Sequence, residues 1–336
     1  MTFWFPWTRL ALEWINNILV SILQASQKGS IFLFGPLAIS PGESLADGTK
    51  SIGFVLAMQV LPSVIFFSAL ISLLYYLNVV QKCVGLFAKI FSNSMGLSGA
   101  ESFSASISIF FGIESSISVR SYIDQMTKSE LLTLITCMMA TVASTVMGIY
   151  IIALNNIFPQ IAGHLFSASI ISIPCAVLIS KLSIPENKIP TTLNMKSHEY
   201  PKEISLNDSV NSDGKQSLNM MVALIDGGSQ GVKLAISIAT LLIVVIGLQE
   251  IFNLVLELLP NLGGASISIN RILGWFIWPL TILIGLKPDE LVLGSQILGS
   301  RFVETEVGAY FQLASVQSTE IPAFSLRSFI AMTYSL

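Results

Sequence analysis

The chain has 336 residues, a net charge of −3 and only 11% charged side chains, while 53% of its residues are hydrophobic and its mean hydropathy is +0.74. This composition excludes an ordinary soluble domain and a basic nucleic-acid-binding protein, and it predicts a polytopic membrane protein. Cys83, Cys137 and Cys175 lie far apart in apolar segments and form no metal-binding or redox pair, so we expect buried, free thiols.

The N-terminal part predicts one membrane span and two amphipathic helices. Residues 1–14 lack the pattern of a removable signal peptide. Residues 10–23 have polar side chains at helical spacing, which is typical of an interfacial helix, and residues 29–50 predict a loop. The span is expected over residues 52–80, with a kink at Pro62 and a buried amide at Gln59 that needs a partner, and an amphipathic helix follows over residues 82–95.

Residues 98–120 place carboxylates and many hydroxyls inside a very apolar chain. An apolar half, residues 105–111, runs into Gly112, and a second half begins after Glu114. The stretch is too short and too polar to span a membrane, and non-helical backbone at membrane depth is tolerated only where protein or a water-filled cavity surrounds it. We therefore predict a re-entrant hairpin with its tip near residues 112–116, beside a substrate cavity.

Two further spans and a polar loop follow the first hairpin. Thr127 and Glu130 have the spacing of a capping box, which begins a helix expected to run to about residue 157. Residues 166–181 predict the next span. Residues 183–217 contain prolines and nearly balanced charges, so they predict a solvated loop that gives no orientation in the membrane.

The last third of the chain predicts a long span and a second hairpin. A span is expected over residues 234–259, with Asp226 before it in a turn or cap. Trp275 and Trp278 fit an aromatic belt at the membrane surface. Residues 290–317 are again a broken apolar segment with carboxylates, and such a pair of segments indicates the midplane site of a transporter.

These elements divide the chain into five parts and predict an all-α membrane fold with two re-entrant hairpins. The parts are residues 1–97 with the first span, 98–182 with the first hairpin, 183–218 as the loop, 219–268 with the long span, and 269–336 with the second hairpin and the start of a truncated final span.

Three stretches resemble the concentrative nucleoside transporter family. Residues 58–70 are similar to the family's Phe-Gln-Val-Leu-Pro-Thr-Ile-Ile-Phe-Phe-Ser-Ala-Leu, and residues 101–122 to Glu-Ser-x-x-x-x-x-Asn-Ile-Phe-x-Gly-Gln-Thr-Glu followed by Arg-Pro-Tyr. Residues 294–310 are similar to Gly-Ser-x-x-Gly-Thr-Lys-x-Val-x-Asn-Glu-Phe-Val-Ala-Tyr. Against that pattern the chain lacks the family's first one or two spans and its last two.

The resemblance implies a nucleoside symporter with an elevator mechanism, forming a homotrimer in the lipid bilayer of a bacterial inner membrane, with no organic cofactor and no nucleic-acid partner. It also implies an interfacial helix over residues 219–232, before the long span. Within residues 140–148 it implies an unwound, ligand-lining segment, for which close packing of small side chains is the alternative. The substrate-binding residues that it implies are Ile113, Glu114, Val146, Thr305 and Glu306, with Glu114 at the nucleobase and Glu306 at the ribose. The implied sodium ligands are Ser108, the carbonyl of Phe111, Thr141 and the carbonyl of Val142.

Several alternatives stay open at this point. Ser108 stands where the family has Asn, so coupling to Na⁺ and coupling to H⁺ through Glu114 are both retained. Structural ion pairs are the alternative for two carboxylates, Glu114 with Arg120 and Glu306 with Arg301.

Two other glutamates are expected outside the substrate site. Glu304 is additional to the family pattern and is expected to face solvent or a basic residue, and Glu101 to satisfy backbone or neighbouring helix groups. The alternative function is a transport-inactive relative that acts as a binding or structural subunit. An enzyme is disfavoured, because the chain has no HExxH or GxSxG motif and only His164 and His198, of which the first is expected at the interface.

Overall fold

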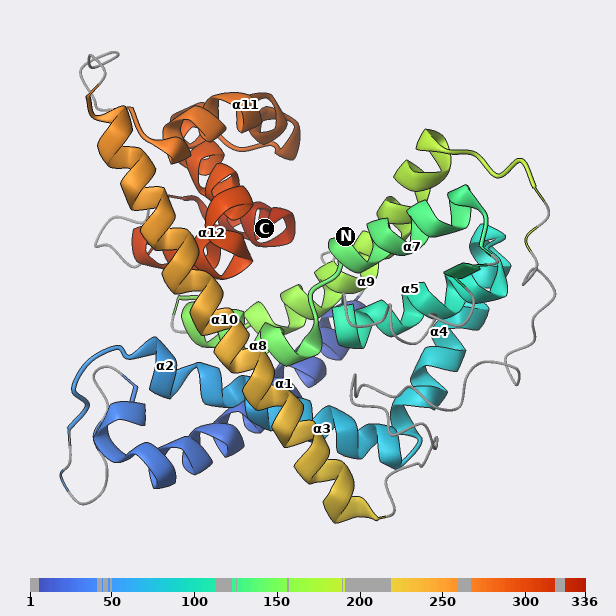
Figure 1. Cartoon of the computed structure of the whole chain (residues 1–336), viewed down its shortest axis with the longest axis horizontal. Helices are drawn as coiled ribbons and strands as arrows, with labels where there is room; N and C mark the ends of the chain where they lie inside the picture. Colours follow the sequence, from blue (N-terminus) through green and yellow to red (C-terminus); the bar gives the residue numbers. More distant parts are fainter. Residues whose placement is uncertain are drawn as a thin grey trace. The chain divides into compact units, whose positions relative to one another are not determined.

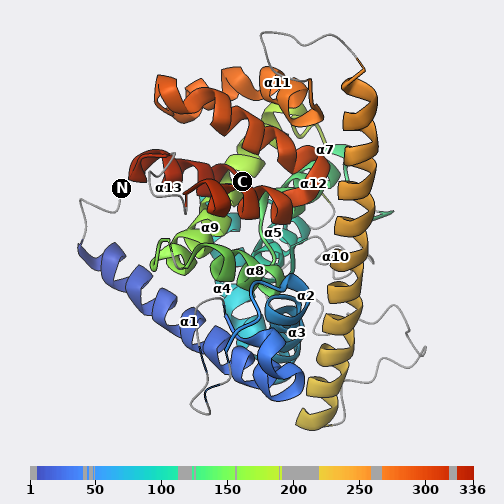
Figure 2. The same cartoon turned by 90° about the vertical axis from the view of Figure 1, so that its left-hand side faces the viewer.

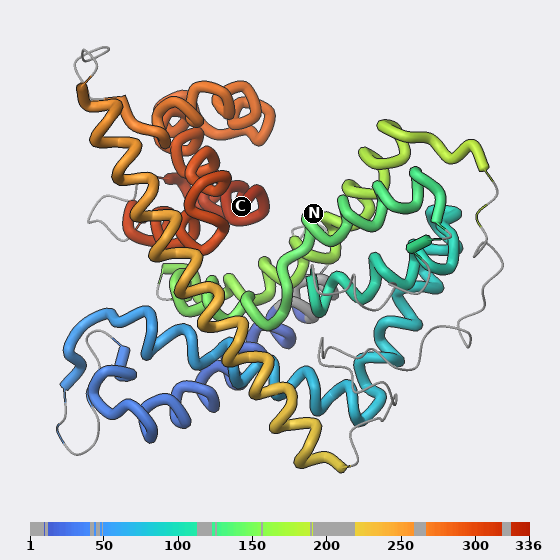
Figure 3. Tube along the Cα trace, in the orientation of Figure 1, coloured from blue at the N-terminus to red at the C-terminus, as the bar shows by residue number. Residues whose placement is uncertain are grey.

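The computed structural model describes residues 6–40, 44, 48, 50–112, 123–124, 126–155, 157–188, 190, 219–258, 267–317 and 324–336. Figures 1 and 3 show that the long elements in these ranges are helices. The chain forms two compact units, the first built from Met1–Gln24, Ile149–Leu165 and Ala235–Leu336, the second from Ala25–Gly148 and Phe166–Leu234. Five helices of the described residues are long and apolar enough to cross a membrane, in line with the composition. One of them, Glu13–Ala38, lies where the sequence pattern predicted an interfacial helix and a loop instead of a span.

The N-terminal helix is longer than the sequence pattern indicates. Helix α1 spans Pro6–Phe34 and continues into a 3-10 turn, η1, at Gly35–Ala38, so the loop expected from residue 29 is wrong for its first ten residues. A single glycine such as Gly29 costs a helix only about 1 kcal/mol, and the apolar residues that follow it continue the helical pattern, so the helix does not end there.

The predicted proline kink and buried amide are confirmed. A short α2, Leu56–Gln59, is followed after Val60 by α3, Leu61–Tyr76, with Pro62 in its first turn. Gln59 Nε2 donates to three backbone carbonyls, those of Leu37 at 3.2 Å, Ile39 at 2.9 Å and Gly53 at 2.7 Å. The amide thereby ties α2 to the segment that follows α1.

Helix α5, Gly99–Phe111, is the centre of the second unit. All of its residues except Phe110 are buried. It packs with α4, Val79–Met95, and α7, Lys128–Ala140, in one apolar cluster, and with α9, Ile161–Ser183, in another that includes the thiol of Cys137. Because α5 is buried on all sides, apolar side chains are expected all around it, which explains the apolar residues 105–111. Of the three free cysteines Cys137 is buried, Cys83 is half-buried and Cys175 is exposed, so the expectation of burial is wrong for Cys175.

The interfacial helix and the long span predicted around Val232 form one continuous helix, α10, Met220–Leu256. Asp226 lies inside this helix, so its prediction as a turn or cap is wrong. Added Cβ atoms would lie 2.4 Å from Ser72 Cβ at Gly227 and 2.6 Å from Ile65 Cα at Gly231. These glycines therefore let α10 approach α3 closely rather than ending the helix.

The first unit gathers the C-terminal helices (Figure 2). They are α11, Ile269–Ile284, the 3-10 turn η4, Pro288–Glu290, α12, Leu291–Gln317, and α13, Leu326–Ser335. Helices α11 and α12 approach closely at two glycines, because a Cβ added at Gly299 would lie 3.0 Å from the amide nitrogen of Gly274.

Glu290, outside the five candidate spans, joins the starts of α12 and α13. Its carboxylate accepts from the backbone N–H of Ser325 at 2.7 Å and of Lys287 at 3.2 Å. Burial acts to raise the pKa of Glu290, but these bonds and that from the Ser328 hydroxyl outweigh it and hold the pKa below its usual value.

Candidate functional site

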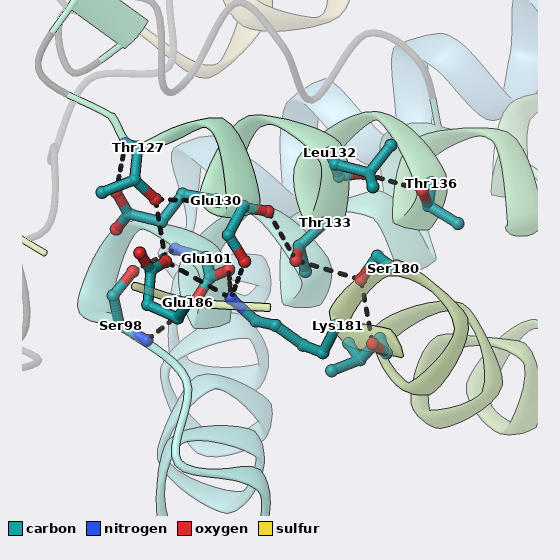
Figure 4. A network of polar contacts seen from close by, with 12 residues as sticks. Ser98, Glu101, Thr127, Glu130, Leu132, Thr133, Thr136, Ser180, Lys181 and Glu186 are labelled. Atoms are coloured by element: carbon teal, nitrogen blue, oxygen red, sulfur yellow. Dashed lines mark hydrogen bonds and ion pairs between the residues drawn. The ribbon is translucent and has the colours of Figure 1, made fainter. Parts of the chain in front are cut away.

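Lys181 fixes the helix ends that carry the first hairpin (Figure 4). Its Nζ lies 2.6 Å from Glu101 Oε1 and donates to Ser129 Oγ at 3.0 Å, which joins α9 to the first turns of α5 and α7. Glu101 also accepts from the backbone N–H of Ser98 at 3.1 Å, in a capping box. The structural role predicted for Glu101 is therefore confirmed.

Helix α7 begins at the predicted capping box, in which Thr127 Oγ1 accepts from the N–H of Glu130 and the Glu130 carboxylate accepts from the N–H of Thr127. Thr127 Oγ1 also donates to Glu186 Oε2 at 2.8 Å, and Glu186 lies 3.7 Å from Lys181. The N-terminal ends of α5 and α7 are thus held by one polar network.

The helix expected to run from residue 127 to about residue 157 is broken, because α7 ends at Ala140 and α8 spans Ser144–Leu154. Thr141, at the end of α7, is extended, with φ −110° and ψ 142°. The break lies against the end of α5: Ser144 Oγ donates to the Ile109 carbonyl at 3.3 Å, and a Cβ added at Gly112 would lie 3.1 Å from Ala143 Cβ. The segment is unwound, as the resemblance implies.

The four candidate ion ligands lie in the last turn of α5 and in the break between α7 and α8. Ser108 Oγ donates to the Ser104 carbonyl at 2.8 Å, and Thr141 Oγ1 donates to the Cys137 carbonyl at 3.0 Å, so each hydroxyl proton points at a carbonyl of its own helix. Phe111 is the last residue of α5 and Val142 lies in the break, where carbonyls lack the next helical turn to bond. These oxygens are the ligands that a hard cation prefers.

The predicted tip of the first hairpin, with Ile113 and Glu114, lies outside the described residues, as does Arg120, so the predicted pairing of Glu114 with Arg120 stays a prediction. Val146 is half-buried in the first turn of α8. Its neighbour Thr145, also within the segment implied to line the ligand, is 3% exposed, and its Oγ1 has no hydrogen-bond partner among the described residues.

The second hairpin is interrupted where the pattern predicts. Thr305 has φ 66° and ψ 175° within α12, and a positive φ is strained for a β-branched side chain. Glu304 Oε2 lies 2.6 Å from Gln312 Nε2, although eight residues of continuous helix would separate them by about 12 Å along the axis. The chain therefore changes direction at Thr305.

Glu306 follows this break and has two partners in the first unit. Its Oε1 lies 2.6 Å from Arg301 Nη2, and its Oε2 accepts from the Tyr150 hydroxyl at 3.0 Å. The ion pair that was the alternative for Glu306 is thus present. A carboxylate accepts about four hydrogen bonds and the Glu306 side chain is 29% exposed, so acceptor positions remain for a ligand.

Arg301 and Tyr150, the two partners of Glu306, each make a further contact that holds them in place. Arg301 Nη1 donates to the Ser335 carbonyl of α13 at 3.1 Å. The Tyr150 ring stacks on Tyr310 at 4.3 Å, and the Tyr310 hydroxyl donates to the Thr333 carbonyl. Tyr310 belongs to the segment that resembles the family, but no local pattern indicates Tyr150, which comes from a helix 156 residues away.

The sequence prediction for Glu304 is wrong. It faces neither solvent nor a basic residue in the part of the chain that the structure describes, since it is 8% exposed and bonds to amides. Its donors are Gln249 Nε2 at 2.8 Å, Asn270 Nδ2 at 3.1 Å and Gln312 Nε2 at 2.6 Å. The positions of Gln249 and Asn270, on helices distant in sequence, explain why the pattern around Glu304 did not reveal them.

An open groove of about 490 Å³ lies along α11 and α12, apart from the residues of both predicted sites. Trp275 and Trp278 are about half exposed beside it, which fits the predicted aromatic belt. The residues that line the groove are Arg271, Gly274, Trp275, Trp278, Val292, Ser295 and Gln296.

Two family models match the chain. Residues 164–336 match the model described as Na⁺ dependent nucleoside transporter C-terminus, and residues 57–156 match one described as nucleoside recognition. The first model covers about half of the chain and includes the second hairpin.

Curated relatives agree with these models. A protein described as an uncharacterized transporter of Haemophilus influenzae is 29% identical over 321 residues, which cover 92% of this chain and 68% of the relative. Nucleoside permease NupC of Helicobacter pylori is 29% identical over 311 residues, with the same coverage of 92% and 68%. Human solute carrier family 28 member 3 is 28% identical over 340 residues, which cover 97% of this chain but only 45% of the human protein.

A solved structure gives the same result at the level of the fold. The structure titled CNTnw in an inward-facing substrate-bound state matches with a TM-score of 0.83 and 26% identity, covering 99% of this chain and 74% of that one. The predicted fold class, a helical membrane protein, and the prediction of a transporter rather than an enzyme are thereby confirmed. The chain belongs to the concentrative nucleoside transporter family.

Proposed function

We propose that the chain is a secondary active transporter that moves nucleosides across a bacterial inner membrane, driven by a cation gradient. The observation that carries the proposal is the break of α12 at Thr305, which leaves the carboxylate of Glu306 partly exposed beside Arg301 and Tyr150. Hydrogen bonds to an ionised acceptor are about twice as strong as neutral ones, so this group suits the hydroxyls of a neutral ribose.

In this proposal Thr305 and Glu306 bind the ribose, while Ile113, Glu114 and Val146 contact the nucleobase. Arg301 positions Glu306, because its second nitrogen is anchored on the carbonyl of Ser335. The support for the substrate is the family and the relative named as a nucleoside permease.

The coupling cation binds, in the sodium form of the proposal, to Ser108 and Thr141 and to the carbonyls of Phe111 and Val142. Buried hydroxyl oxygens at the end of α5 and at the break after α7 support this assignment. The broken elements change position relative to a scaffold during transport, in an elevator-type movement.

The scaffold is proposed to be a homotrimer. Large apolar side chains stay exposed along α10, and lipid or neighbouring copies would cover them. They include Ile236, Ile243, Val244, Leu248, Phe252 and Val255. Native mass spectrometry of the purified protein should show three copies, and a monomer alone would contradict the trimer.

A second candidate is a transport-inactive relative that binds nucleosides or acts as a structural subunit. The observation that favours it is the Arg301–Glu306 ion pair, which already uses both charges of the proposed ribose site. Calorimetric binding of uridine without any uptake would support this candidate over the first.

The test is uptake of radiolabelled uridine into proteoliposomes under an inward Na⁺ gradient, an inward H⁺ gradient, or neither. We expect accumulation under at least one of the two gradients. No uptake under either gradient would reject active transport.

A further inference from the structure

Glu304 and Glu306 are separated only by Thr305, but they face different parts of the first unit. Glu306 bonds to side chains of α8 and α12, whereas Glu304 bonds to amides from α10, α11 and the second half of α12. The proposed substrate site therefore does not account for Glu304.

The surroundings of Glu304 satisfy its hydrogen bonds without cancelling its charge. Gln249 and Asn270 donate to Oε1, and Gln312 donates to Oε2, and all three groups are neutral carboxamides. An ionised carboxylate that is 92% buried in a membrane protein is costly without a compensating cation, so such a group is functional by default.

The charged side chains on the elements around Glu304 have contacts of their own or are exposed. Arg301 pairs with Glu306, the Arg271 guanidinium lies 5.9 Å from the centre of the Trp275 ring, and Glu250 and Glu257 are exposed. Other charged or titratable side chains lie on α8, η4, α12 and α13 and at the residue before η4. They are Tyr150 on α8, Lys287 before η4, Asp289 and Glu290 in η4, Tyr310 on α12, and Arg327 and Tyr334 on α13.

The amide of Gln249 supplies an independent observation. This side chain is 9% exposed, and its Oε1 is buried without a hydrogen-bond partner among the described residues. The amide nitrogen of the same group lies 2.8 Å from Glu304 Oε1. If the amide turns by half a rotation, its oxygen takes the nitrogen's place and can accept a hydrogen bond from a protonated carboxyl.

We propose that Glu304 binds a proton reversibly and that the Gln249 amide turns to bond with either form. A hydronium ion transfers its proton to Glu304 Oε1 and leaves as water, the carboxylate becomes a neutral acid, and this acid donates to Gln249 Oε1. Loss of the proton restores the arrangement in the structure, in which the amide donates to the carboxylate.

A proton fits this cluster better than a sodium ion. The three donors already lie 2.6 to 3.1 Å from the carboxylate oxygens, so little space is left between them. Sodium requires oxygen ligands and would need several amides to turn away their nitrogens. A proton requires the Gln249 amide to turn, which also gives up the 3.4 Å hydrogen bond from Gln249 Nε2 to Asn270 Oδ1.

The direct test is pH-difference infrared spectroscopy of the purified protein. On acidification the native protein should gain the C=O stretching band of a protonated carboxylic acid that Glu304→Gln lacks. Glu250→Gln, at an exposed position one residue from Gln249, should keep it. An identical difference spectrum for the native protein and Glu304→Gln would overturn the proposal.

A second variant covers the case in which Glu304→Gln does not fold. Glu304→Asp keeps the acid but shortens the side chain, so its band should persist at a shifted frequency because the amide contacts differ. An unshifted band would assign the signal to another carboxyl and overturn the proposal.

The coupling role of this proton rests on the proposed transport function, and transport assays test that part separately. With Glu304→Gln, uridine exchange without a gradient should continue, while accumulation driven by an H⁺ gradient should be lost. H⁺-driven accumulation equal to that of the native protein would contradict the coupling role.

If only a Na⁺ gradient drives uptake, and Glu304→Gln abolishes it without an infrared change, a sodium site replaces the proton site. Absence of exchange in the native protein would count against the transport function and not against the infrared result.

Discussion

At the scale of single residues, the proposed substrate site depends on Glu306 and on the backbone just before it. The carboxylate is oriented by Arg301 on one oxygen and by Tyr150 on the other. The strained conformation of Thr305 places Glu306 after the break instead of on a continuous helix. Charge and backbone can be changed independently at these two positions.

Glu306→Gln should weaken uridine binding about tenfold, because a neutral acceptor loses about 1.5 kcal/mol of charge-assisted hydrogen bonding. Saturation of uridine uptake, or calorimetry where binding is tight enough, measures the change. Glu257→Gln, at an exposed position directly after α10, is the matched control and should bind as the native protein does. Equal affinity of Glu306→Gln and the control would remove Glu306 from the site.

Thr305→Gly should raise the thermal unfolding midpoint of the detergent-purified protein. Glycine relieves about 1 to 3 kcal/mol of strain at φ 66°, which exceeds its entropic cost of about 0.5 to 1 kcal/mol. The same exchange at Thr136, inside α7, has no strain to relieve and should lower the midpoint. A lower midpoint for both variants would show that Thr305 is not strained.

At the scale of helices, small residues and buried charges decide how the elements pack. Gly227 and Gly231 allow α10 to lie against α3, and Lys181 holds the ends of α5, α7 and α9 together. Neither arrangement depends on a ligand, so stability measurements test both without transport.

Gly227→Ala should destabilise the protein by about 1 to 3 kcal/mol, because the new methyl group would overlap Ser72 Cβ and lie 2.9 Å from the backbone of Ala69. Gly228→Ala is the matched control. A Cβ there meets nothing within 4 Å, so the variant should be neutral or more stable by up to about 1 kcal/mol. Chemical denaturation compares the two, and equal effects would contradict the close packing of α10 on α3.

Lys181→Met should destabilise the protein by about 3 kcal/mol, since it leaves the carboxylate of Glu101, which is 2% exposed, without its cation. The double variant Lys181→Met, Glu101→Gln removes the stranded charge and should recover part of the loss. Lys188→Met, at an exposed position, should have little effect. If Lys181→Met unfolds no earlier than Lys188→Met, the ion pair does not hold these helices.

At the scale of the whole molecule, hydropathy and local chemistry predicted most of the helices and the positions of their breaks. The capping box at Thr127, the kink before Pro62 and the interruption of the second hairpin follow from rules that act within a few residues. The unwound segment after Ala140 followed from the resemblance, because its small and hydroxyl residues alone also fit close packing.

Sequence reasoning failed where a distant neighbour decides the outcome. The glycines near Asp226 predict a turn unless α3 is known to pack on them. The environment of Glu304 depends on Gln249, 55 residues away, and that of Glu306 on Tyr150, 156 residues away. The first hairpin tip, with Ile113 and Glu114, lies outside the described residues, and its roles stay predictions.

The most direct test of transport is uridine counterflow, in which proteoliposomes loaded with unlabelled uridine take up external radiolabelled uridine without any ion gradient. The account predicts transient accumulation of label above equilibrium in the native protein and in Glu257→Gln. It predicts at least about tenfold less at the same low uridine concentration in Glu306→Gln, from the loss of affinity. Absence of counterflow in the native protein, or counterflow that Glu306→Gln leaves unchanged, would contradict the proposal that Glu306 binds a transported nucleoside.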